Sequence, residues 1–158
     1  MNQHHLYLGK AGQAYVMSQF LARGWNVAVP EVDIGDDLFV VRDAVGEFSR
    51  IQVKTANIVE RKTGYSAQFS LPIPQLERST FPELTYCFVL HGEDDWQRTV
   101  VISRKELLRL YDFSEIGSRI GDVLMLYFSF KDKQLLCSKI DLTGFLNNFK
   151  DFPKIKLN

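Results

Sequence analysis

Three residues between positions 37 and 54 have the types and the spacing that metal-dependent chemistry requires. Asp37 begins one apolar run, while Gln52 and Lys54 alternate with Ile51 and Val53 in the next. Carboxylate and amide oxygens are hard ligands that suit Mg²⁺, which keeps several waters and needs few protein ligands. A lysine beside them can orient a water or stabilise negative charge that develops on phosphorus. The trio therefore predicts hydrolysis of a phosphodiester.

These side chains can act together only if the chain folds them onto one face. We expect a hairpin here, made of two strands and the turn between them: 37–42, 48–55 and 44–47. In that register Asp37 lies opposite Lys54, and Gln52 shares their face because side chains alternate along a strand. The alternative is an exposed hairpin face with a surface ion pair, worth about 0–1 kcal/mol.

The first helix, expected over 9–23, positions a further polar side chain. Gln13, Met17 and Phe20 recur at helical spacing, which places Gln13 on the stripe that faces the core. A polar side chain on that stripe needs a hydrogen-bonding partner. A site at the end of the sheet would supply one; the alternative is a glutamine solvated at the start of the helix.

The remaining patterns predict an α/β (α+β) protein built around a mixed sheet. Strands are expected over 25–29, 66–71, 85–91, 99–102, 123–130 and 134–138, and helices over 74–79, 104–111 and 142–149. The last two strands form a second hairpin. Residues 1–158 are expected to form a single domain, with a core over about 9–110 and C-terminal additions over 111–158.

The 158 residues carry 19 basic and 19 acidic side chains, a net charge of zero. This balance excludes a polybasic, histone-like binder, but it permits a local basic groove. Candidate contacts to a phosphate backbone are cations on or near the hairpin and the loop after it: Arg42, Arg50, Arg61, Lys62 and Arg78. The alternative is that these are solvated loop cations.

Other function classes lack the residues they need. The sequence has no P-loop, no dinucleotide-binding glycine turn and no HExxH zinc motif. Cys87 and Cys137 each lie in an apolar run, which predicts buried, reduced thiols and favours a cytoplasmic protein. No apolar run is long enough for a membrane span, and the first five residues lack the features of a secretory signal.

Several motifs, in the order in which they occur, resemble those of the PD-(D/E)XK nuclease superfamily. The matching stretches are Gly9-Lys10-Ala11-Gly12-Gln13, Leu21-Ala22-Arg23-Gly24-Trp25-Asn26-Val27, Pro30, Asp37-Leu38-Phe39-Val40-Val41 and Gln52-Val53-Lys54-Thr55. The chain is most similar to the small endonuclease-like group that includes an intron-encoded homing endonuclease with glutamine in place of the usual second acid. The resemblance covers roughly residues 9–110 and implies a restriction-endonuclease-like α-β-β-β-α-β core.

The resemblance also implies an activity, which is endonucleolytic cleavage of DNA with Mg²⁺ (or Mn²⁺). By matched position, Asp37, Gln52 and the backbone carbonyl of Val53 would hold the metal, and Lys54 would assist the attacking water. Gln13 stands where members of the superfamily commonly carry glutamate, which removes one negative charge. A homodimer is expected, because cutting both strands usually needs two active sites. The alternative is a catalytically degraded module on the same fold that binds nucleic acid or protein.

Overall fold

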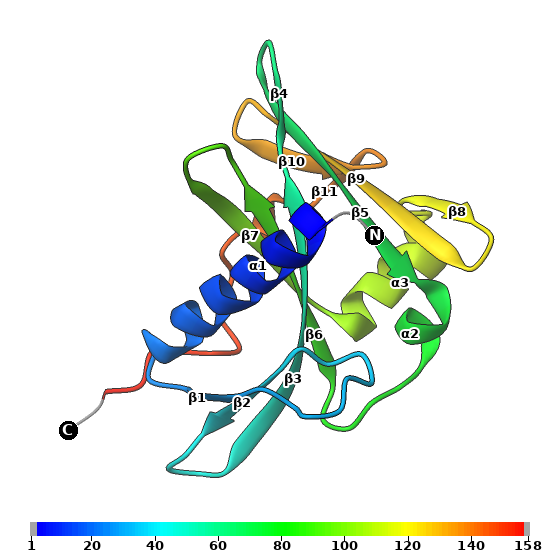
Figure 1. Ribbon diagram of the computed structural model, residues 1–158. Coiled ribbons are helices and arrows are strands. Elements are labelled where there is room, and N and C mark those ends of the chain that lie inside the picture. The colour runs from blue at the N-terminus through cyan, green and yellow to red at the C-terminus, as the bar shows by residue number, and fades with distance from the viewer. Residues whose placement is uncertain (1–2, 157–158) are drawn as a thin grey trace.

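Two β-sheets make up the fold, with helices on both sides of the first (Figure 1). The computed structural model describes residues 3–156. The first sheet has the order β1-β2-β3-β6-β7, and β3 and β6 run parallel while the other neighbours run antiparallel. Its strands are β1 (Asn26–Ala28), β2 (Leu38–Arg42), β3 (Glu47–Asn57), β6 (Leu84–His91) and β7 (Trp96–Ser103). This mixed sheet confirms the predicted fold class.

The second sheet joins segments that lie before and after β6 in the chain. Its order is β11-β10-β9-β5-β4, and β8 pairs with β9. Its strands are β4 (Val59–Arg61), β5 (Gly64–Pro72), β8 (Ser118–Ile120), β9 (Val123–Lys131), β10 (Gln134–Cys137) and β11 (Ile140–Asp141). Because β9 pairs with all of β5, residues 123–131 share a sheet with a strand of the predicted core.

Apolar clusters on the two faces of β6 hold the helices and sheets together. The helical segments are α1 (Gln3–Leu21), α2 (Ile73–Glu77), α3 (Arg104–Ser114) and the 3-10 turn η1 (Thr143–Phe145). On one face, α1 buries Val16 and Phe20 in a cluster with Ile51 of β3. On the other face, Phe88 of β6 belongs to a larger cluster with Phe128 of β9. In Figure 1, α1 and α3 therefore lie on opposite sides of β3 and β6.

At one position, α1 approaches β3 more closely than a side chain on the helix would allow. Gly12 is buried, and a β-carbon built there would overlap the side chain of Thr55 on β3. Glycine therefore permits this contact. Because Gln13 is the next residue of the helix, the contact also sets how closely Gln13 approaches the first sheet.

The predicted hairpin is present, but its register differs from the prediction by two residues. The turn occupies residues 43–46, one residue earlier than expected, and the ladder ends at Leu38 and Ile51, so that the Asp37 carboxylate contacts Gln52 and Asp37 does not lie opposite Lys54. A shift of two keeps each side chain on its expected face, because side chains alternate along a strand. The predicted juxtaposition therefore survives the error in register.

The prediction of a helix over 142–149 is wrong, because only η1 forms there. Asn147 has a left-handed backbone with φ 50°. Its N–H donates to the Thr99 carbonyl at 2.7 Å, and its side-chain oxygen accepts from the Thr99 N–H at 3.0 Å. Thr99 lies on β7, an edge strand of the first sheet, whose backbone groups need partners. Pairing with that edge replaces the helix.

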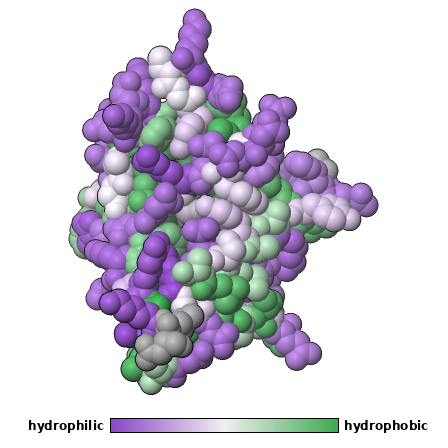
Figure 2. Space-filling view, turned by 90° about the vertical axis from the view of Figure 1, so that its left-hand side faces the viewer, coloured by the Kyte–Doolittle hydropathy of each residue, from purple (hydrophilic) through white to green (hydrophobic). Residues whose placement is uncertain are grey.

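The cysteine-containing apolar runs form buried strands. Cys87 on β6 and Cys137 on β10 are both free and buried, and burial raises the pKa of the Cys87 thiol to about 12. Within residues 3–156, no helix has the length and hydropathy of a membrane span. Figure 2 shows one face of the molecule, where hydrophilic residues separate small apolar patches.

Gly12→Ala should lower the free energy of unfolding by about 1–3 kcal/mol, because the added methyl group forces α1 away from β3. Gly9→Ala is the matched control, since it lies on the same helix and an added β-carbon meets nothing within 4 Å. That control should raise the free energy of unfolding by about 0.5–1 kcal/mol. Urea denaturation followed by circular dichroism measures both. Equal effects of the two substitutions would contradict the close contact.

Candidate functional site

Asp37 lies where β2 and β3 begin to diverge. Its backbone N–H donates to the carbonyl of Ile51, the residue that pairs with Leu38, at 2.8 Å, so the regular ladder between the strands ends here. At the next position the N–H of Val53 donates to the Asp37 side chain, with Oδ2 at 2.7 Å. A buried strand N–H must find an acceptor. The carboxylate of Asp37 therefore does what a strand carbonyl would otherwise do.

The amide of Gln52 lies between two oxygens that could bind a cation. Its Nε2 is 2.6 Å from Asp37 Oδ2 and 3.5 Å from the Val53 carbonyl oxygen. Gln52 is only 8% exposed, so these contacts are shielded from water. A positively polarised NH₂ group therefore occupies a position where oxygens converge.

Gln13 has the partner that its place on the helix requires. The side chain is 8% exposed, and its Nε2 donates to the Asp37 backbone carbonyl at 3.0 Å. Its Oε1 accepts a hydrogen bond from Lys10 Nζ, also at 3.0 Å. Gln13 therefore holds Asp37 through the backbone and adds no negative charge to the site. Lys10 was not predicted, although its spacing of three from Gln13 on the helix is a usable signal.

Burial raises the pKa of the Asp37 carboxyl above its ordinary value. The hydrogen bond from the Val53 N–H opposes this shift in pKa, and so do the positive charges of Lys54 and Lys10. Asp33 adds to the shift through like-charge repulsion. The net direction shows that the ionised carboxylate is under-compensated by the groups around it.

Lys54 lies two residues beyond Gln52 on the same face of β3 and is half-buried. Within residues 3–156 its ammonium makes no hydrogen bond or ion pair, apart from its attraction to the Asp37 charge. A half-buried cation without a fixed partner can interact with an incoming anion.

The donor set fits a hard divalent cation. Asp37 supplies a carboxylate, Val53 a backbone carbonyl, and Gln52 an amide oxygen once its amide turns. Among the described residues, no group of three or more His, Cys, Asp and Glu side chains lies where it could hold a metal ion, so a cation here would depend on the neutral oxygens beside Asp37. One carboxylate with neutral oxygens is the pattern of Mg²⁺, which keeps several waters.

A groove of about 530 Å³ extends from Lys54 between α1, β3 and the second sheet, with His5 and Leu8 of the helix in its lining. Its lining includes Asn57, Arg61, Gln68 and Tyr127, and contains no Asp or Glu from the described part of the chain. The Arg61 guanidinium is held by neutral partners, with Nε 3.0 Å from Ser66 Oγ and a terminal nitrogen 3.2 Å from the Tyr127 hydroxyl. Two cations without an acidic partner therefore share one groove.

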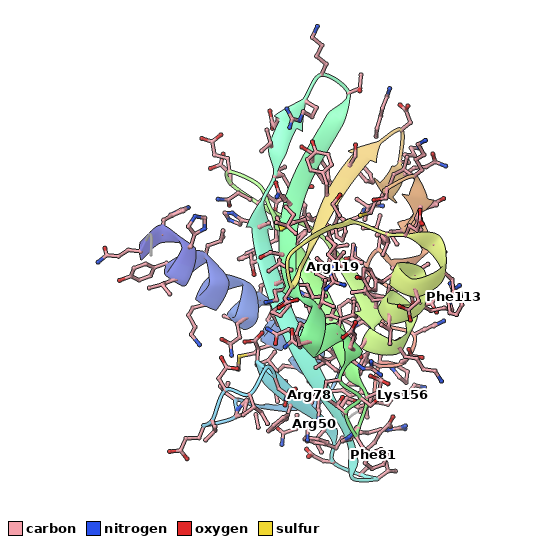
Figure 3. All side chains as sticks on the ribbon, turned by 90° about the vertical axis from the view of Figure 1, so that its right-hand side faces the viewer. Arg50, Arg78, Phe81, Phe113, Arg119 and Lys156 are labelled. Carbon is pink, nitrogen blue, oxygen red and sulfur yellow. The ribbon has the colours of Figure 1, made fainter. Side chains whose placement is uncertain are left out.

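The other predicted DNA contacts lie outside this groove. Arg42 pairs with Glu47 at 3.9 Å, and Arg50 pairs with Asp36 at 2.5 Å. Arg78 donates to the Ile34 carbonyl at 3.0 Å, so Arg50 and Arg78 both bind the loop before β2 (Figure 3). Lys62 is exposed at the turn between β4 and β5.

Gln75 on α2 also contacts the site, and the sequence contained no signal for it. Its Nε2 donates to Gln52 Oε1 at 3.2 Å and to the Gly35 carbonyl at 3.0 Å. Gln75 is 23 residues from Gln52 in the chain, and only the crossover from β3 to β6 brings α2 beside the hairpin.

Comparisons with known proteins show what this chain resembles. No protein-family model matches it. A stretch of 72 residues is 39% identical to Protein 5.3 of Escherichia phage T7 and covers 45% of this chain and 58% of that protein, less than two thirds of its length. The solved structure of a bacterial homing endonuclease, I-Ssp6803I, matches 90% of this chain and 86% of its own, with a TM-score of 0.53 and 19% sequence identity. The fold is therefore endonuclease-like.

Asp37→Asn should raise the free energy of unfolding near pH 7. Because burial raises the pKa of Asp37, the folded protein holds this proton more tightly than the unfolded chain, and stability falls as pH rises through the folded pKa. Asparagine can still accept from the Val53 N–H but has no charge to desolvate. The gain should shrink toward about pH 4, close to the ordinary aspartate pKa. Urea denaturation at both pH values measures this, and a destabilised variant near pH 7 would contradict it.

Proposed function

We propose that this protein is a metal-dependent DNA endonuclease of the PD-(D/E)XK type. The observation that carries the proposal is the convergence of oxygens from Asp37 and Val53 on the Gln52 amide, with Lys54 next on the same face. The endonuclease-like fold supports it, as does the description of the solved structure that shares this fold as a homing endonuclease. Cutting a duplex would use two such sites, so a homodimer is part of the proposal.

The proposed reaction is hydrolysis of a phosphodiester bond by water. Asp37, Val53 and Gln52 would hold Mg²⁺ or Mn²⁺, which when bound lowers the pKa of a water and stabilises charge on the phosphate. Lys54 would orient the attacking water and stabilise negative charge on the phosphoryl oxygens. Gln13 would keep Asp37 in position through its backbone carbonyl.

The groove next to Lys54 is the proposed path of the DNA strand. Its described lining contains no acid, so a phosphate backbone meets no like charge there. Arg61 offers a guanidinium that is already oriented by Ser66 and Tyr127, which suits contact with a phosphate beyond the scissile one. This arrangement explains how a chain of zero net charge could bind DNA.

A second candidate function is a nuclease-fold module that binds nucleic acid or protein without cutting. Gln13 favours this candidate, because it is neutral and leaves Asp37 as the one carboxylate in contact with Gln52 among the residues described. DNA binding without cleavage in both Mg²⁺ and Mn²⁺ would select this candidate over the endonuclease.

Lys54→Met should reduce plasmid cleavage by at least about 100-fold, because it removes a charge that faces the reacting phosphate. Lys133→Met, in the exposed turn between β9 and β10, is the matched control and should leave cleavage unchanged. Gel assays of supercoiled plasmid with Mg²⁺ or Mn²⁺ measure both variants. Full activity of Lys54→Met would overturn the role proposed for this lysine.

Arg61→Gln should weaken DNA binding and reduce the slope of log K against log salt by about 1, because one phosphate contact is lost. The control is Arg119→Gln on β8, which removes the same charge outside the groove and should leave the slope unchanged. Fluorescence anisotropy with labelled duplex in EDTA, at several salt concentrations, prevents cleavage during the measurement. Identical slopes for wild type and Arg61→Gln would exclude the groove as the path of the strand.

A further inference from the structure

A hydrogen-bonded relay connects the site to the loop that precedes β2. Gln75 Nε2 donates to the Gly35 carbonyl at 3.0 Å and to Gln52 Oε1 at 3.2 Å. Gln52 Nε2 then donates to Asp37 Oδ2 at 2.6 Å. Two amides therefore link a backbone carbonyl at one end to a carboxylate at the other.

The two ends of this relay fix the direction of each bond within it. The Gly35 carbonyl can only accept, so the Gln75 atom that faces it must be nitrogen. The same nitrogen faces Gln52, which must present oxygen there and nitrogen to Asp37. The ionised carboxylate also accepts only, so both ends require the same arrangement.

This arrangement opposes a cation shared by Asp37 and Gln52. A metal ligand must be oxygen, so the Gln52 amide would have to turn and direct its Nε2 at Gln75 Nε2. If Gln75 turned as well, its Oε1 would face the Gly35 carbonyl, and two acceptors would be opposed. In either case one hydrogen bond of the relay is lost.

We propose that Gln75 is a positioning residue that holds Gln52 in its cation-free orientation and couples cation binding to release of the Gly35 carbonyl. The inference rests on the cation site proposed above. One further observation supports it: Gln75 Oε1 is buried and has no hydrogen-bonding partner among the described residues. Once both amides turn, Gln52 Nε2 becomes the donor that this oxygen lacks.

The backbone at Gly35 allows Gln75 to approach. Its φ is 104°, and a β-carbon there would lie 2.5 Å from Gln75 Nε2. Two other contacts hold the same loop, from Arg78 to the Ile34 carbonyl and from Arg50 to Asp36. Release of Gly35 therefore loosens one of three attachments and leaves the loop beside the site.

Gln75→Met tests the proposal by removing the donor while keeping the length of the side chain. Its affinity for Mg²⁺, measured by titration calorimetry on the full chain, should rise by a factor of roughly 2–10, since one opposing hydrogen bond is gone. Arg78→Met is the matched control, because it frees the same loop without touching Gln52. High ionic strength screens the charge that this control removes. The Mg²⁺ affinity of Arg78→Met should remain close to that of wild type.

The outcomes separate this inference from the proposed function. If wild type binds neither Mg²⁺ nor Mn²⁺, or binds them equally well after Asp37→Ala, the cation site and the inference both fail. If wild type binds through Asp37 but Gln75→Met binds equally or more weakly, only the inference fails. Equal tightening in Arg78→Met would also overturn it.

A second measurement uses wild type and does not depend on the variant folding. The side-chain NH₂ resonances of Gln52 and Gln75, assigned by ¹⁵N NMR, should both shift when Mg²⁺ is added. Gln75 resonances that stay unchanged during Asp37-dependent binding would contradict the coupling.

Discussion

The buried N–H of Val53 lies beyond the part of β3 that pairs with β2 and needs an acceptor there. The carboxylate of Asp37, the residue just before β2, supplies it. The rest of the site depends on this hydrogen bond. It holds one carboxylate oxygen against β3, where the Gln52 amide reaches the same atom. Burial of that carboxylate raises its pKa, so the fold tolerates an under-compensated charge there. A cation would compensate the charge. The carboxylate that completes the strand pairing is therefore also the one proposed to bind the metal.

The larger architecture holds Asp37 in place and leaves a groove beside Lys54. Gly12 lets α1 lie against β3, and Gln13 then reaches the Asp37 backbone. The same helix, with β3 and the second sheet, lines the groove that contains Lys54 and Arg61. The helix therefore positions the proposed cation site, and the second sheet shapes the proposed path to it.

Local patterns predicted much of this site, and long-range pairing supplied the rest. Alternation along residues 51–54 was enough to place Gln52 and Lys54 on one face, and that placement survived a register error of two residues because the error was even. Helical spacing correctly indicated that Gln13 needs a partner. The groove requires β5 to pair with β9, and the contact of Gln75 with Gln52 requires the crossover from β3 to β6. Neither is therefore indicated by a local sequence pattern. The prediction of a helix over 142–149 was wrong for the same reason, because Asn147 pairs with Thr99 on the distant edge strand β7.

The most direct test of the central claim is an anomalous difference map from crystals of the protein soaked with Mn²⁺. The account predicts a peak bonded to the Asp37 carboxylate and the Val53 carbonyl, with Gln52 Oε1 turned toward it. It also predicts that the peak disappears in Asp37→Asn crystals. A Mn²⁺ peak bound by other residues, or none at Asp37 in a wild-type crystal with an open site, would contradict the account.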